Sequence, residues 1–147
     1  MKKFAFILLT LAAVTVFVLQ PYYTPLAASE GTNELSPTTG NVTPKEAHSI
    51  VSENAGSGNF VILDVRTPEE FRSGHIKGAL NLDFYSKDFR DKLNKLDKKK
   101  TYLTHCRSGR RSARTLEIMR ELGFKRAYNM LGGIMGWQKE GYPVTGD

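Results

Sequence analysis

Short blocks of apolar residues alternate with polar stretches and predict strands and helices in turn. Compact β-branched runs are typical of buried strands, and apolar residues three or four positions apart are typical of helices. Thr43–Glu46 and Thr67–Glu70 each combine a capping box with proline at the first helical position, so a helix should begin at each. The predicted strands span residues 59–65, 79–82, 101–105 and 124–129. The other predicted helices span residues 86–97, 112–122 and 132–140.

This alternation predicts an α/β domain over residues 43–147. Strands that alternate with helices favour a mostly parallel central sheet covered by helices on both faces. Residues 29–42 are polar, contain glycine and proline and lack periodicity, so we expect a flexible linker there.

Residues 1–28 have the pattern of a secretory signal peptide. Lys2 and Lys3 precede an apolar run over residues 4–19, and small residues follow at 27–29. We therefore expect export, with the domain in the periplasm or outside the cell. The alternative is an uncleaved membrane anchor at residues 4–20, which also places the domain outside.

The charge balance does not point to nucleic acid. The formal net charge is +6, and losing Lys2 and Lys3 with a signal peptide leaves 19 basic and 15 acidic residues, or +4. Aromatic residues do not interleave with the basic ones, and no nucleic-acid-binding motif is present.

Cys106 is the single cysteine of the chain, so it cannot form an internal disulfide. It is therefore either an inert buried thiol or a reactive one. It lies between a predicted strand and a predicted helix, where backbone N–H groups and a helix N-terminus can form an anion-binding nest. The surrounding arginines are Arg107, Arg110, Arg111 and Arg114. Positive charge and a helix N-terminus lower a cysteine's pKa, so we expect a reactive thiolate.

The histidines do not suggest a metal site. His105 precedes Cys106 on a predicted strand, so its side chain should point to the opposite face and pack structurally. His48, His75, His105 and one cysteine lack the usual ligand spacing, and we expect neither a metal nor a cofactor.

Three segments together resemble the rhodanese-like domain family. They are residues 64–71 with 74–79, the loop 106–112, and residues 131–137 with 141–144, in the family's order. The resemblance implies a small α/β domain that moves sulfane sulfur. A donor such as thiosulfate is attacked by the thiolate, the sulfur is held as a persulfide, and an acceptor such as cyanide or a thiol removes it.

The resemblance also assigns roles to residues of this chain. Cys106 would carry the sulfur, Arg107 and Arg110 would attract the anionic donor, and Arg111 would brace the loop. The residues expected to bind substrate, through backbone amides and charge, are Arg107, Ser108, Gly109, Arg110 and Arg111. Those expected to give structural support are Asp64, Arg66 and Ser112, and Trp137 is expected in the core or the pocket wall.

Two other functions stay open at this point. Cysteine-dependent phosphatases place an arginine after five intervening residues, whereas Arg111 follows Cys106 after four. A tighter ring of amides suits one sulfur atom better than a tetrahedral phosphoryl group. The second alternative is a rhodanese-like module used only for binding, although such modules typically lose the cysteine or disrupt the loop.

The expected partners are a small anionic sulfur donor and a thiophilic acceptor. An exported lone thiolate is prone to oxidation. The sequence leaves open whether a bound persulfide protects it or an unidentified thiol reductant or sulfur-acceptor protein acts on it. We expect a monomer.

Overall fold

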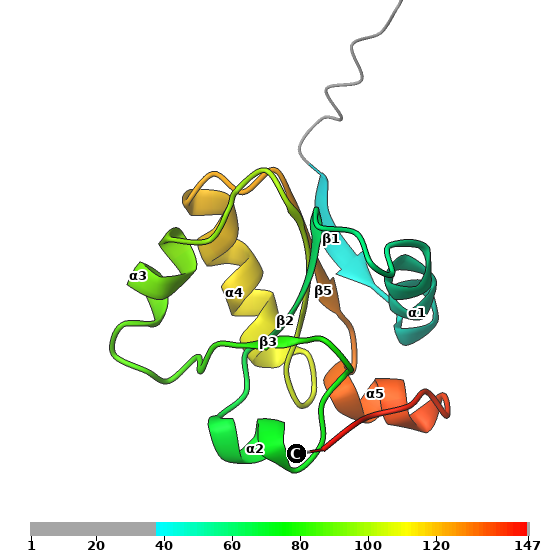
Figure 1. Cartoon of the computed structure of the whole chain (residues 1–147). Helices are drawn as coiled ribbons and strands as arrows, with labels where there is room; N and C mark the ends of the chain where they lie inside the picture. The colour runs from blue at the N-terminus through cyan, green and yellow to red at the C-terminus, as the bar shows by residue number, and fades with distance from the viewer. Residues whose placement is uncertain (1–37, 147) are drawn as a thin grey trace, which may run out of the picture. The chain divides into compact units, whose positions relative to one another are not determined.

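The computed structural model describes residues 38–146, which form a five-stranded sheet and five helices (Figure 1). The strands are β1 (Thr38–Val42), β2 (Phe60–Asp64), β3 (Leu80–Asn81), β4 (Thr101–His105) and β5 (Arg126–Met130). The helices are α1 (Pro44–Glu53), α2 (Pro68–Arg72), α3 (Phe89–Asn94), α4 (Arg110–Glu121) and α5 (Gly133–Lys139). The strand order is β1-β5-β4-β2-β3, and every pairing is parallel, which confirms the predicted fold class.

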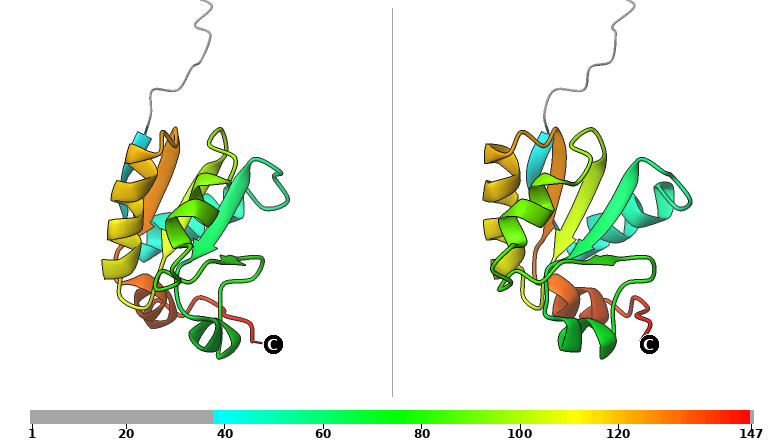
Figure 2. Two further views of the ribbon diagram at one scale, coloured as in Figure 1. Left: turned by 90° about the vertical axis from the view of Figure 1, so that its left-hand side faces the viewer. Right: turned by 60° about the vertical axis from the view of Figure 1, so that its left-hand side comes forward.

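Helices cover both faces of the sheet. α1 and α5 lie on one face and α3 and α4 on the other (Figures 1 and 2). Adjacent strand residues point to opposite faces. Thus Leu63 and Tyr102 join the core beneath α3 and α4, while Ile62 and Leu103 join the core beneath α1 and α5. Burial on both faces explains why β2 reads as a nearly continuous apolar run.

The two capping boxes begin helices as predicted. At α1, the Glu46 amide donates to Thr43 Oγ1 at 3.3 Å, and the Thr43 amide donates to the Glu46 carboxylate at 2.7 Å. At α2, the corresponding distances between Thr67 and Glu70 are 3.3 and 3.2 Å. Both boxes satisfy backbone donors that the first helical turn leaves free.

The expectation of a linker is wrong for residues 38–42, which form β1. β1 pairs in parallel with β5, from Thr38 opposite Arg126 to Val42 opposite Met130. The pairing with β5 supplies the backbone hydrogen bonds of β1, and the polar sequence of residues 38–42 does not predict it. The rest of the expected linker and the expected signal peptide lie outside the described residues. Within residues 38–146, no helix has the length and apolar character needed to cross a membrane.

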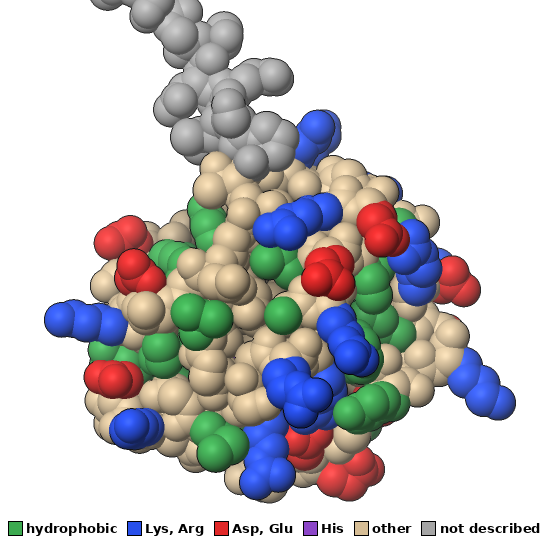
Figure 3. Space-filling model, turned by 180° about the vertical axis from the view of Figure 1, so that it is seen from behind, with side chains coloured by type: hydrophobic (Ala, Val, Ile, Leu, Met, Phe, Trp, Pro, Cys, Tyr) green, Lys and Arg blue, Asp and Glu red, His purple; other side chains and the backbone are tan. Residues whose placement is uncertain are grey.

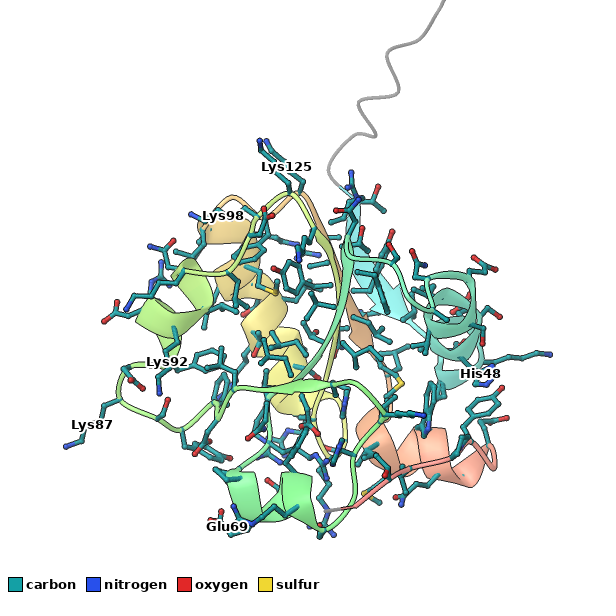
Figure 4. All side chains as sticks on the ribbon, viewed as in Figure 1. His48, Glu69, Lys87, Lys92, Lys98 and Lys125 are labelled. Atoms are coloured by element: carbon teal, nitrogen blue, oxygen red, sulfur yellow. The ribbon has the colours of Figure 1, made fainter. Side chains whose placement is uncertain are left out.

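The sheet brings several loops to one end of the domain. Its parallel strands all finish there, and Cys106 follows the last residue of the central strand β4. Glu69, on α2, projects from that end, whereas Lys98 and Lys125 project from the opposite end (Figure 4). The lysine run at residues 98–100 is therefore remote from the cysteine.

Candidate active site

The cysteine loop is a tight turn between β4 and α4. Helix α4 begins at Arg110, two residues before the predicted start, because Gly109 occupies its N-cap position. Gly109 has φ +92°, and a Cβ there would lie 3.2 Å from both the Gly132 nitrogen and the Met130 oxygen. The turn therefore depends on glycine for both its backbone angle and its close packing.

The start of α5 supports the loop from behind. The Ile134 amide donates to the Cys106 carbonyl at 2.8 Å, and the Met135 amide donates to the Arg107 carbonyl at 3.2 Å. At Gly133, a Cβ would lie only 2.4 Å from the Cys106 carbonyl oxygen. These contacts bind the loop's carbonyl groups to α5 and leave its amides available to the sulfur.

The Cys106 side chain is 1% exposed, and its sulfur accepts two hydrogen bonds. The Gly109 amide lies 3.1 Å from Sγ and the Ser112 hydroxyl 3.5 Å from it. Burial raises the pKa of the thiol, but hydrogen bonds from Ser112, Ser108 and Gly109 together outweigh it and bring the pKa below its ordinary value of 9.0. The loop therefore favours the thiolate, which is the nucleophilic form.

A pocket of about 260 Å³ opens above the sulfur. Its lining residues are Phe84, Tyr85, Cys106, Ser108, Arg110, Arg111 and Arg114. Seen from behind, on the side where α4 lies, Lys and Arg side chains gather over the lower part of the molecule (Figure 3). The pocket is thus cationic, with an aromatic wall on one side.

Arg111 braces the loop against α2. Its two terminal nitrogens donate to the two oxygens of Glu70 at 2.7 and 2.8 Å. Arg111 lowers the pKa of the Glu70 carboxyl, and Glu70 raises the pKa of the Arg111 guanidinium. The same guanidinium lies 5.4 Å from the centre of the Tyr85 ring. This pairing leaves Arg111 less able than Arg110 or Arg114 to bind an incoming anion.

A buried ionic cluster lies behind the loop. Arg66 Nε donates to both oxygens of Asp64 at 2.9 Å, and an Arg66 terminal nitrogen donates to the Gly74 carbonyl at 2.7 Å. His105 is fully buried, with Nε2 at 3.6 Å from the Asp64 carboxylate. Burial lowers the pKa of His105, so the imidazole is neutral at pH 7. Asp64, Arg66 and His105 do not line the pocket. Their contacts instead connect β2, β4 and the segment after α2, which gives the cluster a structural role.

Four sequence-predicted site residues line the pocket, namely Cys106, Ser108, Arg110 and Arg111, and Gly109 and Ser112 contact the sulfur. Arg107 is exposed, and its side chain is not part of the pocket lining. Trp137 packs in the core beneath α1 and α5, where its indole donates to the Pro143 carbonyl at 2.8 Å. Sequence reasoning missed Phe84, Tyr85 and the partner of Arg111, because no local motif indicates that their segments fold over the cysteine loop.

Comparison with known proteins agrees with this geometry. The family model described as "Rhodanese-like domain" matches residues 47–140. A sulfurtransferase of Allochromatium vinosum is 29% identical over 100 residues, covering 68% of this chain and 92% of that protein. A thiosulfate sulfurtransferase of Arabidopsis thaliana chloroplasts is 32% identical over 92 residues, covering 56% of this chain and 77% of that protein. The crystal structure of a rhodanese-related protein from Thermoplasma volcanium superimposes with a TM-score of 0.61 at 31% identity, covering 73% of this chain and 98% of that one.

Proposed function

Because the chain belongs to the rhodanese-like domain family, we propose that it is a sulfurtransferase in which Cys106 carries sulfane sulfur as a persulfide. The donor we propose is thiosulfate or a similar small anion, and the acceptor is cyanide or a thiol. The sulfurtransferases among its relatives support the reaction class.

One observation carries the proposal: Sγ of Cys106 receives hydrogen bonds from the Gly109 amide and the Ser112 hydroxyl at the bottom of an arginine-lined pocket. These donors stabilise negative charge on the sulfur, both in the resting thiolate and in the sulfur that leaves during transfer. Arg110 and Arg114 supply the positive charge that draws an anionic donor to the thiolate despite the repulsion between two anions.

In the first half-reaction, the Cys106 thiolate attacks the outer sulfur of thiosulfate. A new sulfur–sulfur bond forms at Sγ, the sulfur–sulfur bond of thiosulfate breaks, and its electron pair leaves with sulfite. In the second half-reaction, cyanide or a thiolate attacks the outer sulfur of the persulfide. The bond to Sγ breaks, its electron pair stays on Cys106, and the product is thiocyanate or a new persulfide.

The position of Arg111 argues against phosphatase chemistry. A phosphatase loop needs a free arginine that holds the phosphoryl group with two hydrogen bonds. Here both terminal nitrogens of Arg111 bind Glu70, and Ser112 stands one position later with its hydroxyl toward the sulfur.

The test is intact-protein mass spectrometry of the domain after mixing with thiosulfate and then with cyanide. We expect Cys106 to gain one sulfur atom with thiosulfate and to lose it with cyanide as thiocyanate appears. In Cys106→Ser we expect neither step, together with an unchanged circular dichroism spectrum, because a hydroxyl fits the site but does not ionise at neutral pH. Thiocyanate production by this variant would contradict the mechanism. A wild-type protein that gains no sulfur from thiosulfate or polysulfide would instead indicate a binding module.

We also propose that the protein is exported to the periplasm or beyond, on the basis of the sequence of residues 1–28. Fractionation of expressing cells tests this, together with the N-terminal sequence of the mature protein. Recovery of the chain in the cytoplasm with Met1 or Lys2 intact would refute it.

A further inference from the structure

We infer that the mouth of the Cys106 pocket is a docking surface for an acidic protein segment that presents a thiol as the sulfur acceptor. The inference rests on the proposed function and names the acceptor's class. The surface, here called the acceptor rim, consists of Tyr85, Arg107, Arg110, Arg114, Leu131 and Met135.

The arginines of the acceptor rim are available to a partner. Arg107, Arg110 and Arg114 are exposed, and none of them forms an ion pair within residues 38–146. Arg111, only one residue from Arg110, is instead bound to Glu70. Thus the loop fixes one arginine as a brace and presents three others to solvent.

Exposed apolar side chains accompany these charges. Tyr85 is 68% exposed, Met135 53% and Leu131 44%, and they make up three of the four large apolar residues that are exposed within residues 38–146. The Met135 amide binds the Arg107 carbonyl at 3.2 Å, and the loop glycine Gly109 packs on Gly132, the residue after Leu131. Tyr85 lines the pocket itself. Exposed apolar residues therefore lie both at the pocket, where Tyr85 is, and next to the cysteine loop, where Leu131 and Met135 are.

A small inorganic anion uses little of this surface. Arg107, Leu131 and Met135 do not line the pocket, so a thiosulfate or cyanide ion beside Sγ does not contact their side chains. A rim that combines arginine with exposed apolar groups is instead typical of protein interfaces, where arginine, methionine and tyrosine are enriched. The positive charge selects an acidic partner, and a pocket of about 260 Å³ above the buried Cys106 has room for one side chain from it.

The transfer needs no added oxidant or reductant. The acceptor's thiolate attacks the outer sulfur of the protonated persulfide on Cys106. A sulfur–sulfur bond forms on the acceptor, the bond to Sγ breaks, and Sγ keeps the electron pair as a thiolate. The acceptor leaves as a protonated persulfide.

The test compares two acceptors, a short peptide with one cysteine between glutamates and the same peptide with glutamines in their place. Sulfur-loaded protein is mixed with each, and the persulfide formed on the peptide is measured by mass spectrometry over time. We expect transfer to the glutamate peptide to be about tenfold faster at low salt, and the difference to shrink as salt is added.

Three variants locate the effect. Arg107→Glu should remove most of the preference for the glutamate peptide, and Met135→Ser should slow transfer to both peptides about threefold while leaving thiosulfate–cyanide turnover unchanged. Lys125→Glu makes the same charge change at the opposite end of the domain and should have no effect (Figure 4). Urea unfolding of each variant shows whether it is folded.

The outcomes separate this inference from the proposed function. If no persulfide forms on Cys106, the proposed function fails. If thiosulfate–cyanide turnover is normal but both peptides react equally and the variants change nothing, the docking surface alone is refuted. Saturable binding to phosphatidylglycerol vesicles that Arg107→Glu abolishes, without a preference for the glutamate peptide, would also overturn it and assign the rim to a membrane surface.

Discussion

The contact between Glu70 and Arg111 allows a prediction with a built-in control. Glu70 does two things: it caps α2 through the Thr67 amide, and it holds both terminal nitrogens of Arg111. Glu46 makes the same cap at α1 with Thr43, but among residues 38–146 it has no arginine partner. Replacing each glutamate by glutamine preserves an oxygen for the cap, so the difference between the two variants isolates the ion pair.

The expected magnitude follows from the burial of the pair. Removing one partner of a fully buried pair costs about 3–5 kcal/mol, whereas exposed pairs contribute at most about 1 kcal/mol. The side chains of Arg111 and Glu70 are 16% and 29% exposed, which places this pair between the two limits. We expect Glu70→Gln to lower the free energy of unfolding by about 2 kcal/mol, or the Tm by roughly 10 °C. Glu46→Gln should leave the free energy of unfolding nearly unchanged, because Glu46 is exposed.

The loss of stability caused by Glu70→Gln should become smaller as the pH falls. Arg111 lowers the pKa of Glu70 below its ordinary value of 4.5, so the pair's contribution is fully present above pH 4.5 and is lost as the pH falls through the lower folded-state value. Urea unfolding at pH 7 and at stepwise lower pH measures this. Equal losses for the two variants at pH 7, or a Glu70→Gln loss that grows on acidification, would refute the reasoning.

Three further predictions concern the cysteine loop. Ser112→Ala removes a hydrogen-bond donor to Sγ, so the pKa of Cys106 should rise and the thiolate fraction at pH 7 should fall. Alkylation of Cys106 by iodoacetamide should therefore slow about fivefold. An unchanged alkylation rate would exclude a contribution from the Ser112 hydroxyl. Arg110→Ala should raise the KM for thiosulfate about threefold without changing the free energy of unfolding, and an unchanged KM would contradict its role. Gly133→Ala combines φ +55° with a Cβ 2.4 Å from a backbone oxygen, so urea unfolding should show a loss above about 3 kcal/mol. Gly58→Ala, which meets nothing within 4 Å, is its control and should be nearly neutral.

Local chemistry explains which parts of the fold could be predicted. The two threonine caps and the apolar strands act over a few residues, so their positions were readable from the sequence. β1 was not readable, because Thr38–Val42 has almost no apolar character and becomes a strand only by pairing with β5, far along the chain. The start of α4 was displaced because Gly109 fixes the turn through its left-handed backbone angle.

The candidate site was likewise predictable only where its residues are contiguous in the sequence. The segment from Cys106 to Ser112 was recognisable because its chemistry is contiguous. The aromatic wall at Phe84 and Tyr85 and the Glu70 brace come from segments that reach the cysteine only through tertiary packing. No spacing rule connects them to the loop, so sequence reasoning had no signal for them.

Because Cys106 is the single cysteine of the chain, its rate of labelling by a thiol reagent can report opening of the folded state. The Cys106 residue is 1% exposed at the bottom of a pocket of about 260 Å³, so a thiol reagent too large for this pocket cannot reach the sulfur while the loop is closed. Such a reagent can modify Cys106 only while the loop is open, so the labelling rate reports how often the contacts from α2, α4 and α5 separate. In native buffer this rate gives the free energy of opening at the active site, and comparison with global unfolding shows whether the site opens alone or with the whole domain.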